Sequence, residues 1–319
     1  MSGNFMAVGA SIALMLLLSN SAVAQAPRQE PPLQPDPTTL DESAPPGANY
    51  AKADFRFWAP DGASTLDGIL VLNPGSNGEG RGQASDPTWR AWAASHKLAI
   101  IGTHFVDKQP SIVEDYADVS KGSGPALVNA IKAFATRSHH PELATAPLVL
   151  WGMSAGGEVN YEIAAWIPDR VAAFVVNKGN FYYTALASKA TRNIPALLFV
   201  GESDLAYRVD AVTGIWAMNR RPGALWALVQ EPHTPHAVGR SDVMSRLFFD
   251  DVLPMRITSG SATLKPLDPN KGWQGDLSTH AVAAVVPGAK PSDTPTVWLP
   301  TERSAKAWAA VEDATPFDQ

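Results

Sequence analysis

The sequence LVLWGMSAGGEVNYEIAAW at residues 148–166 decides the fold. Its first four residues are apolar, as in a buried strand, and its second half repeats apolar residues every three or four positions, as in a helix. Between these halves lies a G-x-S-x-G sequence centred on Ser154. Glycine is needed there because side chains flanking the strained turn would clash with the strand and the helix. The context predicts that Ser154 is a nucleophile, and a glycine-rich turn without chemistry is the alternative.

The rest of the chain repeats this alternation of strand and helix. Seven apolar runs have the length of strands, and they lie at 54–58, 69–72, 98–103, 148–151, 172–176, 196–200 and 225–230. Helical spacing occurs in six segments, at 87–95, 124–138, 156–166, 209–219, 241–249 and 302–312. The later strands are almost entirely apolar, as buried parallel strands are. This alternation predicts an α/β fold with a doubly wound, mostly parallel sheet and helices on both faces.

The N-terminus has the pattern of a signal peptide over residues 1–26. A twelve-residue apolar segment, Ala7–Leu18, is followed by small residues that offer a cleavage site after Ala24 or Ala26. The apolar segment is too short to span a bilayer, which needs about 20 residues. We therefore expect a secreted or periplasmic protein without stable membrane insertion.

Composition divides the remaining chain into three parts. Residues 27–50 are rich in Pro, Gln, Asp and Glu and predict a tether. Residues 51–254 carry the alternation of strand and helix, so they predict the catalytic domain. Residues 255–319 are rich in Pro and Gly and predict a C-terminal extension packed on the catalytic domain, with Trp273 and Trp298 as its apolar anchors.

The overall composition excludes several classes of function. Of 319 residues, 45% are hydrophobic, which is enough for a substantial core, and the chain contains no cysteine. Disulfide scaffolds, thiolate zinc sites and a cysteine nucleophile are therefore excluded. The formal net charge of −6 and the lack of a long Lys/Arg run argue against nucleic acid as a partner. Oligomeric state is left open by the sequence.

The acid that would support the serine follows the strand at 196–200. In a sheet of this kind the expected order along the chain is serine, acid and histidine, each on a loop at the carboxyl end of a strand. The strand runs into Gly-Glu-Ser-Asp, which ends at Asp204. We take Asp204 as the acid that orients the histidine, with Glu202 and Asp210 as neighbours that could displace it.

The base follows the strand at 225–230, in the sequence Glu-Pro-His-Thr-Pro-His. We prefer His236 to His233 because it lies just before the helical segment that begins near Gly239. His233 is then a structural loop histidine. A zinc site made by the H-x-x-H pair is disfavoured, because no third ligand lies nearby and the prolines prevent a helix from aligning the two rings.

Acyl transfer also needs two N–H groups aimed at the developing oxyanion. We assign one to the backbone of Ala155, directly after the serine. The other should come from the loop after the strand at 69–72, where we choose the N–H of Ser76, with that of Asn77 second. A phosphate cradle over 75–82 is the alternative, but this loop lacks both the GKS/GKT ending and the G-x-G-x-x-G register.

Three aromatic residues, Phe181, Tyr182 and Tyr183, follow the strand at 172–176 and are candidates to line a substrate pocket. Packing in the core is an equally good account of them. Only residues 177–193 separate this strand from the next, and such a segment is too short for a separate cap domain. We therefore expect Ser154 to lie in an open cleft.

The segment at 152–157, followed in order by Asp204 and His236, resembles the α/β-hydrolase superfamily over roughly residues 54–254. The export signal and the Pro-Gly-Ser loop are similar to those of secreted bacterial carboxylesterases, including feruloyl-esterase-like and polyester-depolymerase-like members. The resemblance implies a serine carboxylic-ester hydrolase that acts on a small-molecule or polymeric ester through an acyl-enzyme, without cofactor or metal. An amidase or peptidase with the same triad, and a non-catalytic carbohydrate- or cell-wall-binding protein on this scaffold, are the alternatives.

Overall fold

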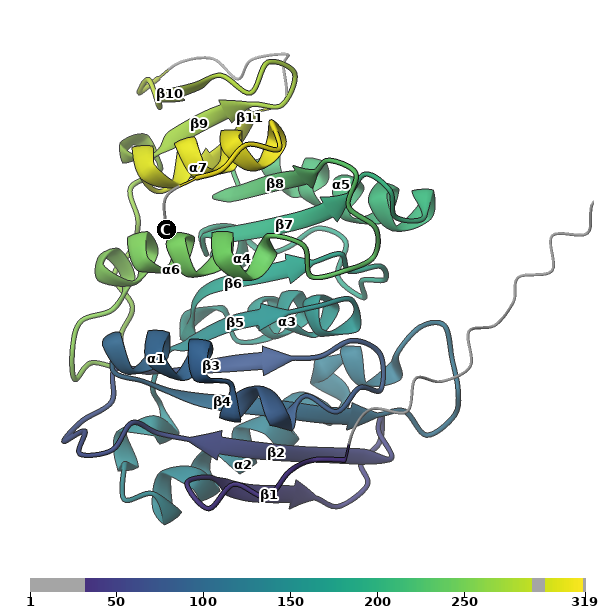
Figure 1. Cartoon of the computed structure of the whole chain (residues 1–319), viewed down its shortest axis with the longest axis vertical. Helices are drawn as coiled ribbons and strands as arrows, with labels where there is room; N and C mark the ends of the chain where they lie inside the picture. The colour runs from purple at the N-terminus through teal and green to yellow at the C-terminus, as the bar shows by residue number, and fades with distance from the viewer. Residues whose placement is uncertain (1–31, 289–295, 318–319) are drawn as a thin grey trace, which may run out of the picture. The chain divides into compact units, whose positions relative to one another are not determined.

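The structure is a computed structural model that describes residues 32–288 and 296–317. The signal peptide predicted over 1–26 lies outside the described residues. Within this part of the chain, eight strands form one sheet in the order β1-β2-β4-β3-β5-β6-β7-β8 (Figure 1). The strands are β1 (Leu40–Ala44), β2 (Lys52–Trp58), β3 (Gly68–Asn73), β4 (Leu98–Val106), β5 (Leu148–Gly152), β6 (Val171–Asn177), β7 (Ala196–Gly201) and β8 (Trp226–Glu231).

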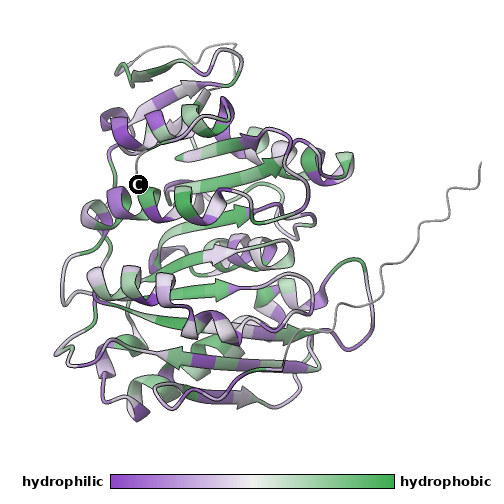
Figure 2. Ribbon diagram, in the orientation of Figure 1, coloured by the Kyte–Doolittle hydropathy of each residue, from purple (hydrophilic) through white to green (hydrophobic). Residues whose placement is uncertain are grey.

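The sheet is mostly parallel. Strands β1 and β2 pair antiparallel to each other, β2 pairs antiparallel to β4, and every later pairing from β4 to β8 is parallel. Strands β3, β5, β6 and β7 are buried along their whole length. Figure 2 shows these central strands as predominantly hydrophobic. They need apolar side chains on both faces because helices cover both sides of the sheet.

The helices form two layers. Helices α1 and α6 lie on the near face of the sheet in Figure 1, and α2 and α3 lie on the far face. The helices are α1 (Pro87–Ser95), α2 (Ser123–Arg137), α3 (Ala155–Trp166), α4 (Lys189–Arg192), α5 (Ala206–Arg220), α6 (Ser241–Arg256) and α7 (Glu302–Glu312). All seven strands and all six helices predicted from the sequence are present. The prediction of a doubly wound sheet with helices on both faces is confirmed.

The predicted tether over 27–50 needs correction, because part of it belongs to the sheet. Residues Leu40–Ala44 form β1, which pairs with β2 along its full length. The side chain of Arg56 on β2 donates two hydrogen bonds of 2.8 Å to the carboxylate of Asp41 on β1. Strand β1 lies at the edge of the sheet and alternates half-buried and exposed residues, so its sequence carries no apolar run.

The C-terminal extension contains more structure than the single helix predicted for it. Strands β9 (Trp273–Asp276), β10 (Val282–Ala284) and β11 (Thr296–Leu299) form a second sheet in the order β10-β9-β11. Of the two predicted anchors, Trp298 is buried and Trp273 is half-buried. The principal anchor is Trp308 on α7, which is fully buried and donates a hydrogen bond of 2.7 Å to the carbonyl of Leu228 on β8.

Strand order, parallel pairing and a G-x-S-x-G turn between β5 and α3 together define an α/β-hydrolase fold, as the sequence resemblance implied. Helices of the described residues all fall short of the length and apolar character that a bilayer crossing requires.

Candidate active site

Ser154 occupies the turn between β5 and α3, at the carboxyl edge of the parallel strands. Its backbone has φ 54° and ψ −125°, outside the regions that residues other than glycine usually adopt. A Cβ on Gly156 would lie 2.2 Å from the carbonyl oxygen of Asn73, and a Cβ on Gly152 would lie 2.3 Å from that of Gly156. Both glycines are therefore required by close backbone contacts. The Ser154 N–H donates 2.7 Å to the carbonyl of Asn177 at the end of β6, which holds the turn in place.

The loop after β3 runs directly beside this turn. A Cβ on Gly75 would lie 3.7 Å from the Cβ of Ser154. The Asn77 N–H donates 3.0 Å to the hydroxyl of Tyr116, so this group is already bonded. By contrast, the N–H groups of Ser76 and Ala155 make no hydrogen bond within the described residues. Of the two N–H groups considered for the loop, that of Ser76 is thus the one without a hydrogen bond in the described residues.

Asp204 and His236 meet at the same edge of the sheet. His236 Nδ1 lies 2.6 Å from Asp204 Oδ2, and the acid side chain is 2% exposed against 25% for the imidazole. Asp204 Oδ1 accepts hydrogen bonds from the Leu205 N–H at 2.7 Å and from Arg208 at 3.2 Å. Burial raises the pKa of Asp204, but the bonds from His236, Leu205 and Arg208 outweigh it and hold the pKa below its usual value. A carboxylate bonded to Nδ1 leaves Nε2 as the nitrogen that can exchange a proton.

The loop that carries His236 is joined to the serine turn through Asn177. The Asn177 amide donates 3.4 Å to the carbonyl of Val238, and its own carbonyl accepts from the N–H of Ser154. The Ser203 N–H donates 3.0 Å to the carbonyl of Thr234, which joins the acid and histidine loops. No hydrogen bond links the Ser154 hydroxyl to His236 in the part of the chain that is described. The turn, the acid and the histidine are therefore neighbours on one edge, with the serine and imidazole not bonded to each other.

The competing residues take no part in this arrangement. Glu202 and Asp210 are exposed, and neither bonds to His236. His233 is exposed and has φ 55°, which is typical of a turn. Across residues 32–288 and 296–317, no group of three His, Asp or Glu side chains could hold a metal ion.

A buried ion pair that the sequence analysis missed lies beneath the histidine loop. Lys178 follows β6, Glu231 ends β8, and the Lys178 ammonium donates a hydrogen bond to the Glu231 carboxylate. The other oxygen of Glu231 accepts 2.5 Å from the Arg240 N–H, so the carboxylate holds both ends of the loop from 231 to 240. Burial lowers the pKa of Lys178, and the charge of Glu231 opposes this shift. In the sequence, this pair is indicated by a lysine and a glutamate that each come directly after an apolar strand-like run.

The three candidate substrate aromatics differ in their surroundings. Tyr182 is partly buried and packs against the core, with its ring centroid 5.1 Å from that of Tyr161. Phe181 is half-buried. Tyr183 is exposed and donates 3.1 Å from its hydroxyl to the carbonyl of Glu114, across to the loop after β4.

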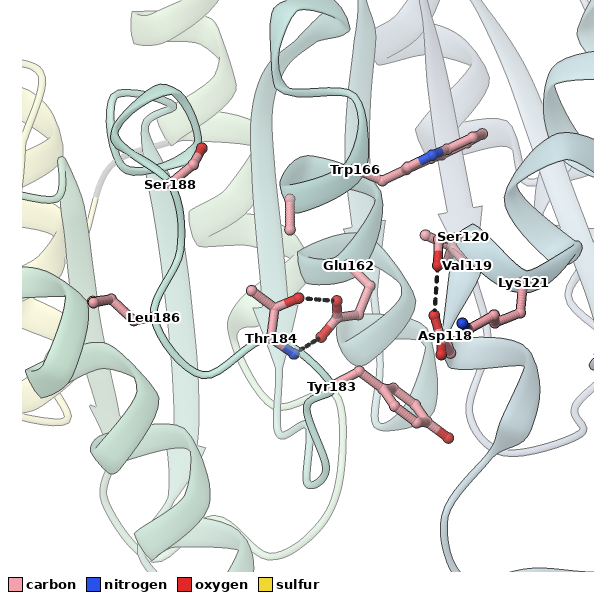
Figure 3. Close-up of a pocket in the computed structure, with 11 residues that line it drawn as sticks. Asp118, Val119, Ser120, Lys121, Glu162, Trp166, Tyr183, Thr184, Leu186 and Ser188 are labelled. Carbon is pink, nitrogen blue, oxygen red and sulfur yellow. Dashed lines mark hydrogen bonds between the residues drawn. The ribbon is translucent and has the colours of Figure 1, made fainter.

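Tyr183 also lines a cavity of about 550 Å³ along α3 (Figure 3). Glu162 lines this cavity and accepts hydrogen bonds of 2.8 Å from both the N–H and the hydroxyl of Thr184. Trp166 and Asp118 lie on other sides of it.

Comparison with known proteins found no matching family model and no matching curated protein. A thermostable esterase of known structure is similar to this chain with a TM-score of 0.48 and 12% identity, over 61% of this chain and 55% of the esterase. Poly(aspartic acid) hydrolase-1 from Sphingomonas sp. KT-1 is similar with a TM-score of 0.47 and 16% identity, over 66% of this chain and 98% of that chain. The alignment thus spans about half the length of the esterase. The strand order and the turn at Ser154 are those of an α/β-hydrolase fold.

Proposed function

We propose that this protein is an exported serine hydrolase that cleaves carboxylic esters, small or polymeric, through an acyl-enzyme. Ser154 is the nucleophile, His236 the general base and acid, and Asp204 the residue that fixes the imidazole. The backbone N–H groups of Ser76 and Ala155 form the oxyanion hole. Export rests on the signal-peptide pattern of residues 1–26 and is tested by sequencing the N-terminus of protein recovered from the periplasm or the medium.

The reaction has two halves. The Ser154 oxygen attacks the ester carbonyl while His236 Nε2 takes the hydroxyl proton, and the carbonyl oxygen becomes negative against the two N–H groups. Collapse of this intermediate breaks the bond to the alcohol, which leaves with the proton from His236. Water then attacks the acyl group in the same way, with His236 as base, and releases the carboxylic acid and Ser154.

One observation carries the proposal: the strained Ser154 turn and the bonded Asp204–His236 pair share one sheet edge. Residues in unfavourable backbone conformations cluster at functional sites, and they persist only where the surrounding structure holds them in place. Around Ser154, the surrounding structure is a turn in which Gly152 and Gly156 have no room for a side chain. The unbonded N–H groups are those of Ser76, on the loop after β3 that runs beside this turn, and of Ala155, the first residue of α3.

The test is hydrolysis of p-nitrophenyl acetate and butyrate by the wild type and by Ser154→Ala. We expect the variant to fold normally and to lose activity on the order of 10⁴-fold or more. Turnover retained in the variant would exclude Ser154 as the nucleophile. Matched p-nitroanilides in the same assay distinguish an esterase from an amidase with the same triad, and a fully inactive wild type would favour the non-catalytic alternative.

A further inference from the structure

The two N–H groups of the proposed oxyanion hole belong to different elements. Ser76 lies on the loop after β3, residues 74–78, which we name the oxyanion loop, whereas Ala155 is the first residue of α3. Two donors stabilise one oxyanion only if their separation and directions are fixed before the reaction, and a misplacement of about 1 Å can cost about 100-fold in rate. Side chains that join the oxyanion loop to α3 are therefore candidates for setting this geometry.

Three buried polar side chains form a chain of hydrogen bonds next to the serine turn. The Thr103 hydroxyl on β4 donates 2.6 Å to the side-chain oxygen of Asn73, and the Asn73 amide donates 2.7 Å to the side-chain oxygen of Asn160 on α3. The Asn160 amide then donates 2.9 Å to the carbonyl of Val175 on β6. We name Thr103, Asn73 and Asn160 the buried network.

The buried network lies inside the core. Thr103, Asn73 and Asn160 are 0%, 1% and 0% exposed. A buried hydroxyl or amide costs free energy unless it is hydrogen-bonded, so a shift of any member leaves a polar atom without its partner. Each of the two carboxamides is bonded through both its oxygen and its nitrogen, which fixes the direction in which it points. A network joined in this way is rigid.

The buried network connects the oxyanion loop to α3. Asn73 is the last residue of β3 and comes immediately before this loop. Its main-chain oxygen accepts 3.2 Å from the N–H of Met153 in the serine turn. A Cβ on Gly156 would lie 2.2 Å from the same oxygen, so the first turn of α3 packs directly on the backbone of Asn73. The side-chain bond from Asn73 to Asn160 holds these two backbones together.

A core that served stability alone would have apolar side chains at these positions. Strand β3 is otherwise Gly-Ile-Leu-Val-Leu, and the neighbours of Asn160 on α3, Val159 and Tyr161, are buried. Replacing buried hydrogen-bonded partners by apolar groups of the same shape is often nearly neutral or even stabilising. What a buried network adds is a defined relative position of the elements that it joins.

We propose that the members of the buried network are positioning residues, which set the distance between the N–H groups of Ser76 and Ala155. This inference rests on the proposed function and adds three residues to its mechanism. They act through the backbone of the oxyanion loop and of α3 and not on the substrate itself. Loss of the network weakens the hold on the oxyanion, which exists only after attack on the carbonyl, so kcat falls and KM is retained.

The test removes the hydroxyl at the start of the buried network. Thr103→Val keeps the branched shape of threonine but cannot donate to Asn73. With p-nitrophenyl butyrate we expect kcat to fall by about 10- to 100-fold and KM to stay within about twofold of the wild-type value, because the loss is confined to the transition state. Thr103→Ser retains a hydroxyl donor and should restore most of the lost kcat.

A trifluoromethyl ketone, 1,1,1-trifluoropentan-2-one, reports on the oxyanion directly. The Ser154 oxygen bonds to its carbonyl carbon, the carbonyl oxygen takes the electron pair and becomes negative, and the hydroxyl proton passes to His236. We expect Ki in Thr103→Val to rise by the factor by which kcat/KM falls. The pH dependence of kcat/KM should keep its wild-type midpoint, since the bond between Asp204 and His236 is not altered.

Thr191→Val is the matched control, because it makes the same substitution at another buried hydroxyl. Thr191 is 0% exposed, and its hydroxyl donates 3.2 Å to the carbonyl of Ala164. It lies on α4, just before the amino end of β7, and so at the edge of the parallel strands opposite to Ser154. This variant should lower the midpoint of urea unfolding and leave kcat and Ki at their wild-type values.

Each outcome decides. Wild-type values of kcat and Ki in Thr103→Val, with hydrolysis that depends on Ser154, overturn the inference and leave the proposed function standing. The inference is also overturned by equal losses in Thr103→Val and Thr191→Val, by an unchanged Ki beside a reduced kcat, or by a Thr103→Ser enzyme no faster than Thr103→Val. If Thr103→Val does not fold, Thr103→Ala removes the same hydroxyl and is judged in the same way. A wild type without Ser154-dependent ester hydrolysis overturns the proposed function and this inference together.

Discussion

Single residues set the chemistry of this edge of the sheet. Ser154 keeps an unfavourable φ of 54°, a strain of about 1–3 kcal/mol for a residue in such a region. The glycines on either side of it lie close to backbone atoms of Asn73 and Gly156 rather than to flexible side chains. The turn therefore cannot relax locally, and the hydroxyl stays exposed to the groups around it.

The two histidines of the loop after β8 should differ sharply in their contribution to activity. His236→Ala removes the imidazole that is bonded to Asp204, so we expect kcat to fall on the order of 10⁴-fold or more. His233→Ala removes an exposed ring and should have a much smaller effect. Steady-state kinetics with p-nitrophenyl butyrate measure both. If the larger loss belongs to His233, our assignment of the base is wrong.

At this scale the sequence predicted residue types and their order, but not every contact. The strand ends at Asp204 and His236 were enough to bring these residues to one edge, because parallel strands share a carboxyl edge. The choice between Asp204 and Glu202 depends on the direction of each side chain in the loop. The spacing of apolar residues in the sequence does not predict that direction. The pairing of Lys178 with Glu231 spans the intervening strand β7 and could be foreseen only once the strand order was known.

Secondary-structure elements were predicted wherever burial imposed a pattern. Strands β3 and β5 to β7 are apolar because both faces are covered. Helix α3 is buried without interruption from residue 155 to residue 164, so burial there is not confined to one side of the helix. Strand β1 was missed because it lies at the edge and alternates with exposed residues in a Pro-rich segment. Strands β9 to β11 were missed because runs of three or four residues do not establish a period.

The buried pair of Lys178 and Glu231 joins β6 to β8 and closes the histidine loop, so breaking it should affect both stability and activity. In Glu231→Gln the Lys178 ammonium loses its charged partner, and we expect a destabilisation of about 3–5 kcal/mol. We also expect kcat/KM to fall, because glutamine has one acceptor oxygen where the carboxylate has two, so Lys178 and the Arg240 N–H of the loop that carries His236 no longer each have their own acceptor. Urea unfolding and kinetics measure the two effects.

The double variant Lys178→Met/Glu231→Gln separates pairing from packing. Removing both charges should restore much of the stability lost in Glu231→Gln, since no uncompensated charge remains buried. Asp242→Asn, which breaks a partly exposed pair with Arg246 on α6, is the control and should cost about 0–1 kcal/mol. Losses in the double variant equal to the sum of the single losses would show that the two side chains are not coupled.

At the scale of the whole molecule, the C-terminal extension packs on β8 through α7. Trp308 contributes a fully buried indole there, and Glu312 accepts 2.7 Å from the N–H of Gln230. Burial raises the pKa of Glu312 to about 8, with added repulsion from Glu202 and Asp313. The extension is therefore held by a carboxyl group whose neutral form is favoured in the folded state.

Stability should accordingly depend on pH through Glu312. A carboxyl whose pKa rises on folding contributes stability that is fully present below its unfolded value of 4.5 and is lost as pH rises through about 8. Glu312→Gln keeps the acceptor and removes the charge. The Tm of the variant relative to the wild type should therefore increase from pH 5 to pH 9. A difference in Tm that is constant over this range would contradict the raised pKa.

The central claim is that Ser154 is a nucleophile activated by the Asp204–His236 pair. The most direct measurement is reaction with a fluorophosphonate, followed by peptide mapping of the adduct by mass spectrometry. We predict a single adduct on Ser154 in the wild type, none in Ser154→Ala, and much slower labelling in His236→Ala, because the imidazole must take the hydroxyl proton. An unlabelled wild-type protein, or an adduct that persists in Ser154→Ala, would contradict the account.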